Sequence, residues 1–155
     1  TAHNETGEAV ETAVEYGFVT LGGQYLETHA AKVTAPPRSK AVAFTFRAAG
    51  HDGRRGLWFA RSPEFGTAIL RRRPFRELEL QMPGLSVSSV RDDGADRLFT
   101  VRADRYAHAV HFGFGDDARL SDEYFDLLPG EQREVRAYGQ AGKAVEVYSI
   151  YPEGE

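Results

Sequence analysis

Short apolar segments separated by clusters of Gly, Pro and Asp run along most of the chain. Val14–Leu21 and Gln24–Val33 flank a Gly-Gly pair, which predicts a β-hairpin because glycines adopt the turn conformations that other residues avoid. The Pro36-Pro37 pair ends the second strand, since proline cannot donate to the ladder of a central strand. Almost nothing in the chain has the spacing of an amphipathic helix.

Strict alternation of apolar and polar residues predicts a further strand at Ala41–Arg47, with Val42, Phe44 and Phe46 on one face. The remaining predicted strands are Gly56–Arg61, Thr67–Arg72, Leu85–Arg91, Leu98–Ala103, His108–Phe114, Glu131–Tyr138 and Ala144–Tyr151. Ala118–Leu128 is predicted to be extended. Many short strands joined by turns indicate an all-β, antiparallel fold.

The run from Leu120 to Glu131 has the sequence L-S-D-E-Y-F-D-L-L-P-G-E. Its bulky apolar residues lie between acidic ones and predict a core segment at Tyr124, Phe125, Leu127 and Leu128. Pro129-Gly130 predicts a type II turn, because proline fixes φ at the second position and glycine accepts the positive φ that follows. A strand end, a corner and a returning strand suit a β-sandwich.

This run resembles a segment near the C-terminus of β-mannosidases and exo-β-glucosaminidases of glycoside hydrolase family 2. The motif usual in those enzymes is F-S-D-N-Y-F-D-L-L-P-G-E, in the last immunoglobulin-like domain. This chain differs from it at Leu120 and Glu123. The segment Arg72–Val87 is also similar to the lead-in of that domain. The resemblance implies a structural motif formed by Ser121, Asp122, Tyr124, Phe125, Asp126, Leu127, Leu128, Pro129 and Gly130.

Together, pattern and resemblance predict two small immunoglobulin-like β-sandwiches in tandem, at residues 10–82 and 83–152, with the boundary at Met82–Gly84. The first nine residues are expected to be a flexible lead-in. Because the chain begins at Thr1 rather than Met, we expect a piece of a longer protein or a processed product. Sandwiches this small bury only about 60% of their unfolded surface, so we expect them to pack on each other and on a parent protein.

Composition narrows the function classes. The 155 residues are 41% hydrophobic and 27% charged, as in globular proteins, and no window approaches the ~18 apolar residues of a membrane helix. The chain has no cysteine, which excludes disulfides and thiolate metal sites. A net charge of −4 gives no reason to expect nucleic acid. Compartment is undecided: a soluble chain with this composition fits the cytoplasm or secretion with a parent enzyme.

The resemblance implies a parent that cleaves sugars with two carboxylates, ~5–5.5 Å apart in retaining enzymes, on a (β/α)8 barrel. Such a barrel needs roughly 200 residues or more with alternating strands and helices, and this chain has neither. Its acidic pairs, such as Asp92-Asp93, sit on adjacent strand positions and so point to opposite faces. We therefore expect no catalytic residue and no cofactor in this chain.

A metal site is also not expected. The acidic residues Asp116, Asp117, Asp122, Glu123 and Asp126 match no known calcium-loop spacing, and a solvated loop in which Asp122 or Asp126 accepts backbone N–H bonds is favoured over calcium. His108 and His111 are three positions apart, so on a regular strand they face opposite sides and cannot share a metal. Structural roles are favoured for both histidines.

The candidate contacts for a sugar or a partner are Trp58, Tyr124 and Arg72. Trp58 lies in the apolar run G-L-W-F-A, which favours burial. Arg72 belongs to a group of arginines suited either to a solvated face or to ion pairs with a partner, and within a strand it would point away from Arg71 and Arg73. The full group is Arg54, Arg55, Arg61, Arg71, Arg72, Arg73 and Arg76.

The sequence and the resemblance favour a function as the non-catalytic C-terminal accessory region of a β-mannosidase-like glycoside hydrolase, which buttresses the catalytic barrel. Its partners would be that barrel and the other domains of the parent. The alternative is a stand-alone β-sandwich that binds carbohydrate or protein. Sugar stacking needs a flat, open aromatic ring, whereas the accessory function predicts burial of Trp58, Phe125 and Leu127 and no sugar binding.

Overall fold

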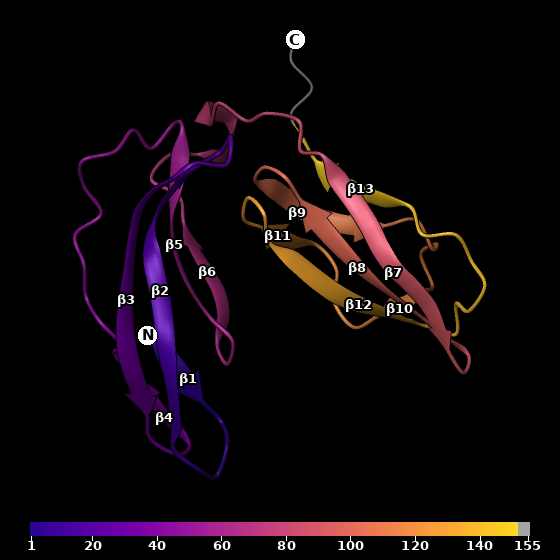
Figure 1. Ribbon diagram of the computed structural model, residues 1–155, viewed down its shortest axis with the longest axis horizontal. Helices are drawn as coiled ribbons and strands as arrows, with labels where there is room; N and C mark the ends of the chain where they lie inside the picture. Colours follow the sequence, from indigo (N-terminus) through magenta and orange to yellow (C-terminus); the bar gives the residue numbers. More distant parts are fainter. Residues whose placement is uncertain (152–155) are drawn as a thin grey trace. The chain divides into compact units, whose positions relative to one another are not determined.

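The computed structural model describes residues 1–151, and in them the chain forms antiparallel sheets with one 3-10 turn, η1 (Phe75–Glu77). The predicted all-β, antiparallel fold is confirmed (Figure 1). None of the described helical structure is long and apolar enough to cross a membrane. The predicted domain end at residue 152 lies outside the described residues.

The chain divides into two compact units. Unit 1 comprises Thr1–Thr20 and Tyr25–Leu78, and unit 2 comprises Leu21–Gln24 and the chain from Glu79 onward. The turn of the predicted first hairpin thus groups with unit 2. The domain limits of 10–82 and 83–152 stay a prediction.

Unit 1 is built on a four-stranded antiparallel sheet in the order β3-β2-β5-β6. Its strands are β2 (Val10–Thr20), β3 (Tyr25–Ala35), β5 (Gly56–Ser62) and β6 (Gly66–Leu70), and a short pair is formed by β1 (Ala2–Asn4) and β4 (Ser39–Ala41). The flexible lead-in expected over the first nine residues is therefore wrong at β1, where Ala2 and Asn4 are buried. The predicted hairpin is confirmed as β2 and β3, and the second strand ends at Ala35, directly before the two prolines. Both strands alternate buried and exposed residues over much of their length.

The strand predicted at Ala41–Arg47 is wrong beyond its first residue, because β4 ends at Ala41. Val42 is 74% exposed and does not share a buried face with the two phenylalanines. Phe44 instead stacks on Tyr16 at 4.2 Å between ring centroids, and Phe46 lies 5.4 Å from Trp58. The alternation therefore comes from aromatic rings that cover the sheet of unit 1, without a partner strand to pair the backbone.

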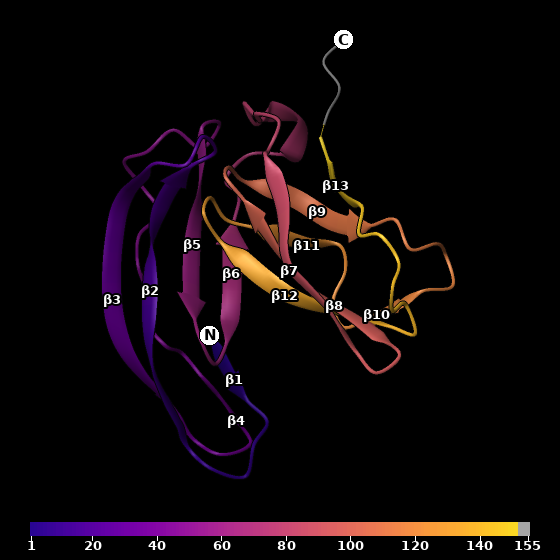
Figure 2. The same ribbon diagram turned by 45° about the vertical axis from the view of Figure 1, so that its right-hand side comes forward.

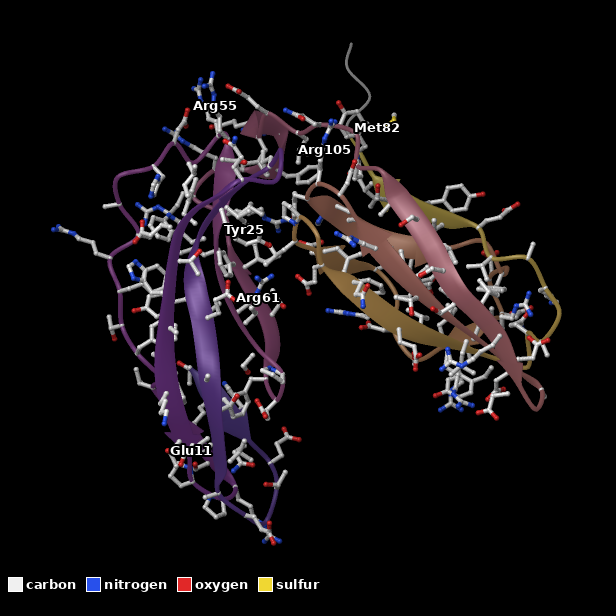
Figure 3. All side chains as sticks on the ribbon, viewed as in Figure 1. Glu11, Tyr25, Arg55, Arg61, Met82 and Arg105 are labelled. Atoms are coloured by element: carbon white, nitrogen blue, oxygen red, sulfur yellow. The ribbon has the colours of Figure 1, made fainter. Side chains whose placement is uncertain are left out.

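Polar contacts fix both faces of this sheet. On one face, Glu27 accepts hydrogen bonds from His29 and His51 at 2.8 Å each, and these two bonds hold the pKa of Glu27 below its ordinary value. On the other, the Arg61 guanidinium donates to Glu15 at 3.1 Å and to the Tyr25 hydroxyl at 3.2 Å; Arg61 and Tyr25 are labelled in Figure 3.

Unit 2 is a sandwich of two antiparallel sheets, in the orders β10-β12-β8-β7 and β11-β9-β13 (Figure 2). The strands are β7 (Leu85–Asp93), β8 (Asp96–Ala103), β9 (Ala107–Phe112), β10 (Arg119–Leu120), β11 (Phe125–Leu127), β12 (Gln132–Tyr138) and β13 (Val147–Ile150). All five strands predicted for this region are confirmed. Inward-facing residues of both sheets share one core, which includes Phe99, Val101, Val110, Phe112, Leu127 and Val135.

The predicted type II turn at Pro129-Gly130 is also confirmed. The N–H of Glu131 donates to the carbonyl of Leu128 at 2.9 Å, which closes the four-residue turn, and Gly130 has φ 79°. Gly130 further donates its N–H to the carbonyl of Ala103 at 2.8 Å, so the corner is tied to the end of β8. This contact fixes where the chain reverses between β11 and β12.

Substituting Gly130 by valine should destabilise unit 2 by about 1 kcal/mol or more, because a β-branched residue is strained at positive φ. The added side chain itself meets no atom within 4 Å, so the cost is conformational. Urea unfolding would measure it. Gly130→Asn is the matched control, since Asn tolerates this φ and should lose less; equal losses in the two variants would contradict the argument.

Candidate functional site

The motif from Ser121 to Gly130 lies in the β10–β12 region and is held largely by its own unit. Ser121 Oγ accepts a hydrogen bond from the N–H of Arg136 at 2.9 Å, and Asp122 pairs with Arg133 at 2.5 Å. The predicted burial of Trp58, Phe125 and Leu127 is confirmed. Leu128 is also fully buried.

Asp126 is the most connected polar residue of the motif. Its carboxylate accepts hydrogen bonds from the buried Tyr106 hydroxyl at 2.7 Å and from the N–H of Ala109 at 3.0 Å, and it lies 2.7 Å from Nδ1 of His108. The expectation that Asp122 or Asp126 accepts a backbone N–H is confirmed for Asp126, but the donor lies on the neighbouring strand β9 and Asp126 lies in β11, so it does not cap a turn of a solvated loop. The carboxylate joins β11 to β9 and serves the fold.

Tyr124 does not belong to the core, contrary to the sequence-based interpretation. Its side chain is 63% exposed and its backbone has φ 57°. The adjacent Phe125, the first residue of β11, takes the inward position instead and is 8% exposed. The Tyr124 ring stacks on His111 at 5.2 Å between centroids, with an angle of 14° between the ring planes.

A bulge in β9 explains why His111 is available for that contact. Ala109 has φ 49°, and His108 and His111 lie opposite Ile150 and Tyr148 of β13. Since those two β13 residues are two positions apart, they share a face, and so do the two histidines. The prediction that His108 and His111 face opposite sides is therefore wrong, because the extra residue at Ala109 shifts the alternation by one.

Tyr148 completes a group of three rings. It is 47% exposed, and its ring lies 5.7 Å from that of His111 at 28°. Its hydroxyl donates to Glu146 at 2.9 Å, and this hydrogen bond to a carboxylate raises the pKa of Tyr148. We call Tyr124, His111 and Tyr148 the aromatic cluster; in it, the imidazole contacts both phenol rings.

The tautomer of His111 follows from its contact. Nδ1 lies 2.9 Å from the carbonyl oxygen of Ala109, which can only accept, so Nδ1 carries the proton in the neutral ring. Nε2 is then the acceptor of the neutral ring. The bulge residue thus both places His111 on the outer face and fixes its orientation.

A surface hollow of about 690 Å³ borders the aromatic cluster, and its wall includes the carboxylates of Asp116 and Glu123. Glu123 also accepts a hydrogen bond from the N–H of Phe112 at 3.4 Å. The described residues that line this hollow include no Lys or Arg. Flat aromatic rings beside carboxylate acceptors suit a neutral or cationic ligand, whereas the negative charge of the carboxylates repels an anion.

The other candidate residues lie elsewhere. Trp58 is 3% exposed and offers no open ring face. Arg72 is exposed in the irregular segment after β6, which ends at Leu70, so the strand expected to run through Arg72 stops short of it. Its contact with a partner stays a prediction. Within residues 1–151, no group of three His, Cys, Asp or Glu side chains could hold a metal ion.

Comparison with known proteins shows which domains and structures this chain is similar to. Residues 80–152 match the family Ig_mannosidase, described as an Ig-fold domain. Among solved structures, a β-D-mannosidase from Dictyoglomus thermophilum matches with a TM-score of 0.80 and 17% identity over 93% of this chain. The chain spans only 19% of that enzyme's length, and no curated protein sequence matches it. Residues 80–152, which carry the motif and the aromatic cluster, are thus similar to the Ig-fold domain described by that family, and this match confirms the predicted immunoglobulin-like fold for this part of the chain.

Proposed function

We propose that this chain is the non-catalytic C-terminal accessory region of a β-mannosidase-like glycoside hydrolase, in which it buttresses the catalytic barrel. The observation that carries the proposal is the match of residues 80–152 to the Ig_mannosidase family. The fold likeness of 93% of the chain to part of a β-D-mannosidase supports it for both units. The partners would be the barrel and the remaining domains of the parent enzyme.

The contacts of the acidic residues support a non-catalytic role. A retaining glycosidase needs two carboxylates ~5–5.5 Å apart on either side of the scissile bond. In the motif, Asp122 is paired with Arg133, and Asp126 accepts hydrogen bonds from Tyr106 and Ala109. These carboxylates are engaged in holding strands together rather than converging on a substrate.

The proposal predicts opposite results for the isolated chain and for its removal. The chain alone should not hydrolyse nitrophenyl β-mannoside or nitrophenyl β-glucosaminide. A parent enzyme that lacks this region should lose thermal stability and active yield, because the barrel surface that the region covers becomes exposed. Activity assays and thermal unfolding of both proteins measure the two effects.

Two outcomes would contradict the proposal. Turnover by the isolated chain that disappears in Asp116→Asn or Glu123→Gln would show that it is catalytic. A shortened parent with unchanged melting temperature and activity would show that the region does not support the barrel.

A further inference from the structure

We propose that the aromatic cluster is a carbohydrate-binding site, in which a pyranose ring stacks on the exposed part of the Tyr124 ring beside the bordering hollow. The hydroxyl groups of the sugar would donate hydrogen bonds to the carboxylates of Glu123 and Asp116 in the bordering hollow. The sequence-based expectation of no sugar binding took Tyr124 for a core residue; because its ring is 63% exposed, the site is compatible with the accessory function and goes beyond it.

The backbone of Tyr124 is strained while its ring is presented to solvent. A bulky residue at φ 57° is a backbone outlier, and such conformations cost roughly 1–3 kcal/mol. The core gains little from this residue, since the ring is 63% exposed and Phe125 fills the interior beside it. A strained backbone that holds an aromatic ring out in water indicates a role on the surface.

The three rings of the aromatic cluster are held in place by contacts with their neighbours. His111 is oriented by its hydrogen bond to the carbonyl of Ala109, and Tyr148 by its hydrogen bond to Glu146. Tyr124 rests against His111 with nearly parallel planes. A ring already fixed in its bound orientation loses little conformational entropy when a ligand stacks on it.

The residues around the aromatic cluster suit a sugar as the occupant. One face of a pyranose is lined by C–H groups and suits a flat aromatic ring, while its hydroxyls suit carboxylate acceptors. A hollow of about 690 Å³ falls within the range of small-molecule sites. Anionic ligands are disfavoured, because Asp116 and Glu123 lie in the wall and no described Lys or Arg does.

The competing occupant is a basic peptide, whose Lys or Arg side chains could also meet aromatic rings and carboxylates. Cation recognition is strongest where several ring faces surround the charge. Here the ring planes are nearly parallel, at 14° and 28°, and stack on one another, so a cation would meet a single face. A single flat platform beside hydrogen-bond acceptors therefore favours the sugar.

Calorimetric titration of the chain with mannohexaose, chitosan hexamer and a hexalysine peptide tests the proposal. We expect saturable binding of at least one of the two oligosaccharides. Tyr124→Asn should weaken that binding about tenfold or more, while Tyr124→Phe should keep it, because the ring and not the hydroxyl carries the contact. Asn tolerates positive φ, so Tyr124→Asn removes the ring without adding backbone strain.

Tyr138→Ala is the matched control, because Tyr138 is an exposed tyrosine on β12, in the other sheet of unit 2, and its loss should leave binding unchanged. Three results would overturn the proposal: no oligosaccharide binding at about 10 mM, well beyond the micromolar-to-millimolar range of useful sites; sugar binding unaffected by Tyr124→Asn; or hexalysine binding alone. The deletion experiment measures the stability and activity of a parent enzyme and not sugar binding by this chain. The accessory proposal and the sugar-binding proposal can therefore fail independently of each other.

Discussion

The substitution Gly17→Ala should destabilise unit 1, so that the variant unfolds under conditions where the unsubstituted chain stays folded. The added Cβ would lie 1.8 Å from the carbonyl oxygen of Glu27 and 2.6 Å from its carbonyl carbon. Both atoms belong to the backbone of β3, so no change of side-chain rotamer relieves the overlap. The pairing register of β2 and β3 shifts between Phe18 and Val19, directly beside this close approach.

The expected loss in the free energy of unfolding is about 3 kcal/mol, at the upper end of what overpacking of a well-packed interior costs. Urea unfolding followed by tryptophan fluorescence measures it selectively. Trp58 is the only tryptophan in the sequence, and it is buried beside Phe18 in unit 1. Its emission therefore reports the unit that contains Gly17.

Gly7→Ala is the matched control for this experiment. Nothing lies within 4 Å of a Cβ built at Gly7, and its φ is not in the left-handed region. An alanine there should leave stability unchanged or raise it slightly, because it restricts the unfolded chain. If Gly17→Ala and Gly7→Ala unfold at the same urea concentration, the close approach of the strands does not limit the residue at position 17.

Most of unit 2 could be predicted from sequence because its strands follow local rules. Alternation located β7, β8 and β12, and the Pro-Gly pair located the corner with the correct turn type. Ala41–Arg47 satisfied the same alternation and still failed. In this segment Phe44 and Phe46 cover the sheet through ring contacts with Tyr16 and Trp58. These partners are distant in the sequence, so a local pattern does not reveal the contacts.

The aromatic cluster escaped sequence reasoning because it depends on two departures from alternation. Ala109 adopts a left-handed conformation without being glycine or asparagine, and Tyr124 does the same directly before β11. One signal was present: Ala109 and Val110 are adjacent apolar residues within the otherwise alternating run A-H-A-V-H-F. Two inward residues in a row indicate a bulge, which places His108 and His111 on one face.

Replacing Asp126 by alanine should cost unit 2 about 2–4 kcal/mol. The substitution removes the acceptor for the Tyr106 hydroxyl, which belongs to a residue only 2% exposed, and the acceptor for the Ala109 N–H. Each buried donor left without a partner costs roughly 1–3 kcal/mol. Asp126→Asn should cost less, because the amide keeps one acceptor oxygen in place.

Far-UV circular dichroism during urea unfolding measures this loss, since unit 2 holds no tryptophan to report it. Asp117→Ala is the control, because Asp117 is exposed and should change stability by less than about 0.5 kcal/mol. A double-mutant cycle sharpens the test: in a Tyr106→Phe background the loss caused by Asp126→Ala should shrink, because the hydroxyl is already gone.

Equal unfolding midpoints for Asp126→Ala and Asp117→Ala would show that the hydrogen bonds of Asp126 contribute nothing to the fold. A full-sized loss has a consequence for the surface as well. Asp126 holds the N–H of Ala109, and the carbonyl of the same residue orients His111. Sugar binding should therefore weaken in Asp126→Ala even where the chain stays folded, because the bulge that places His111 beneath Tyr124 loses its anchor.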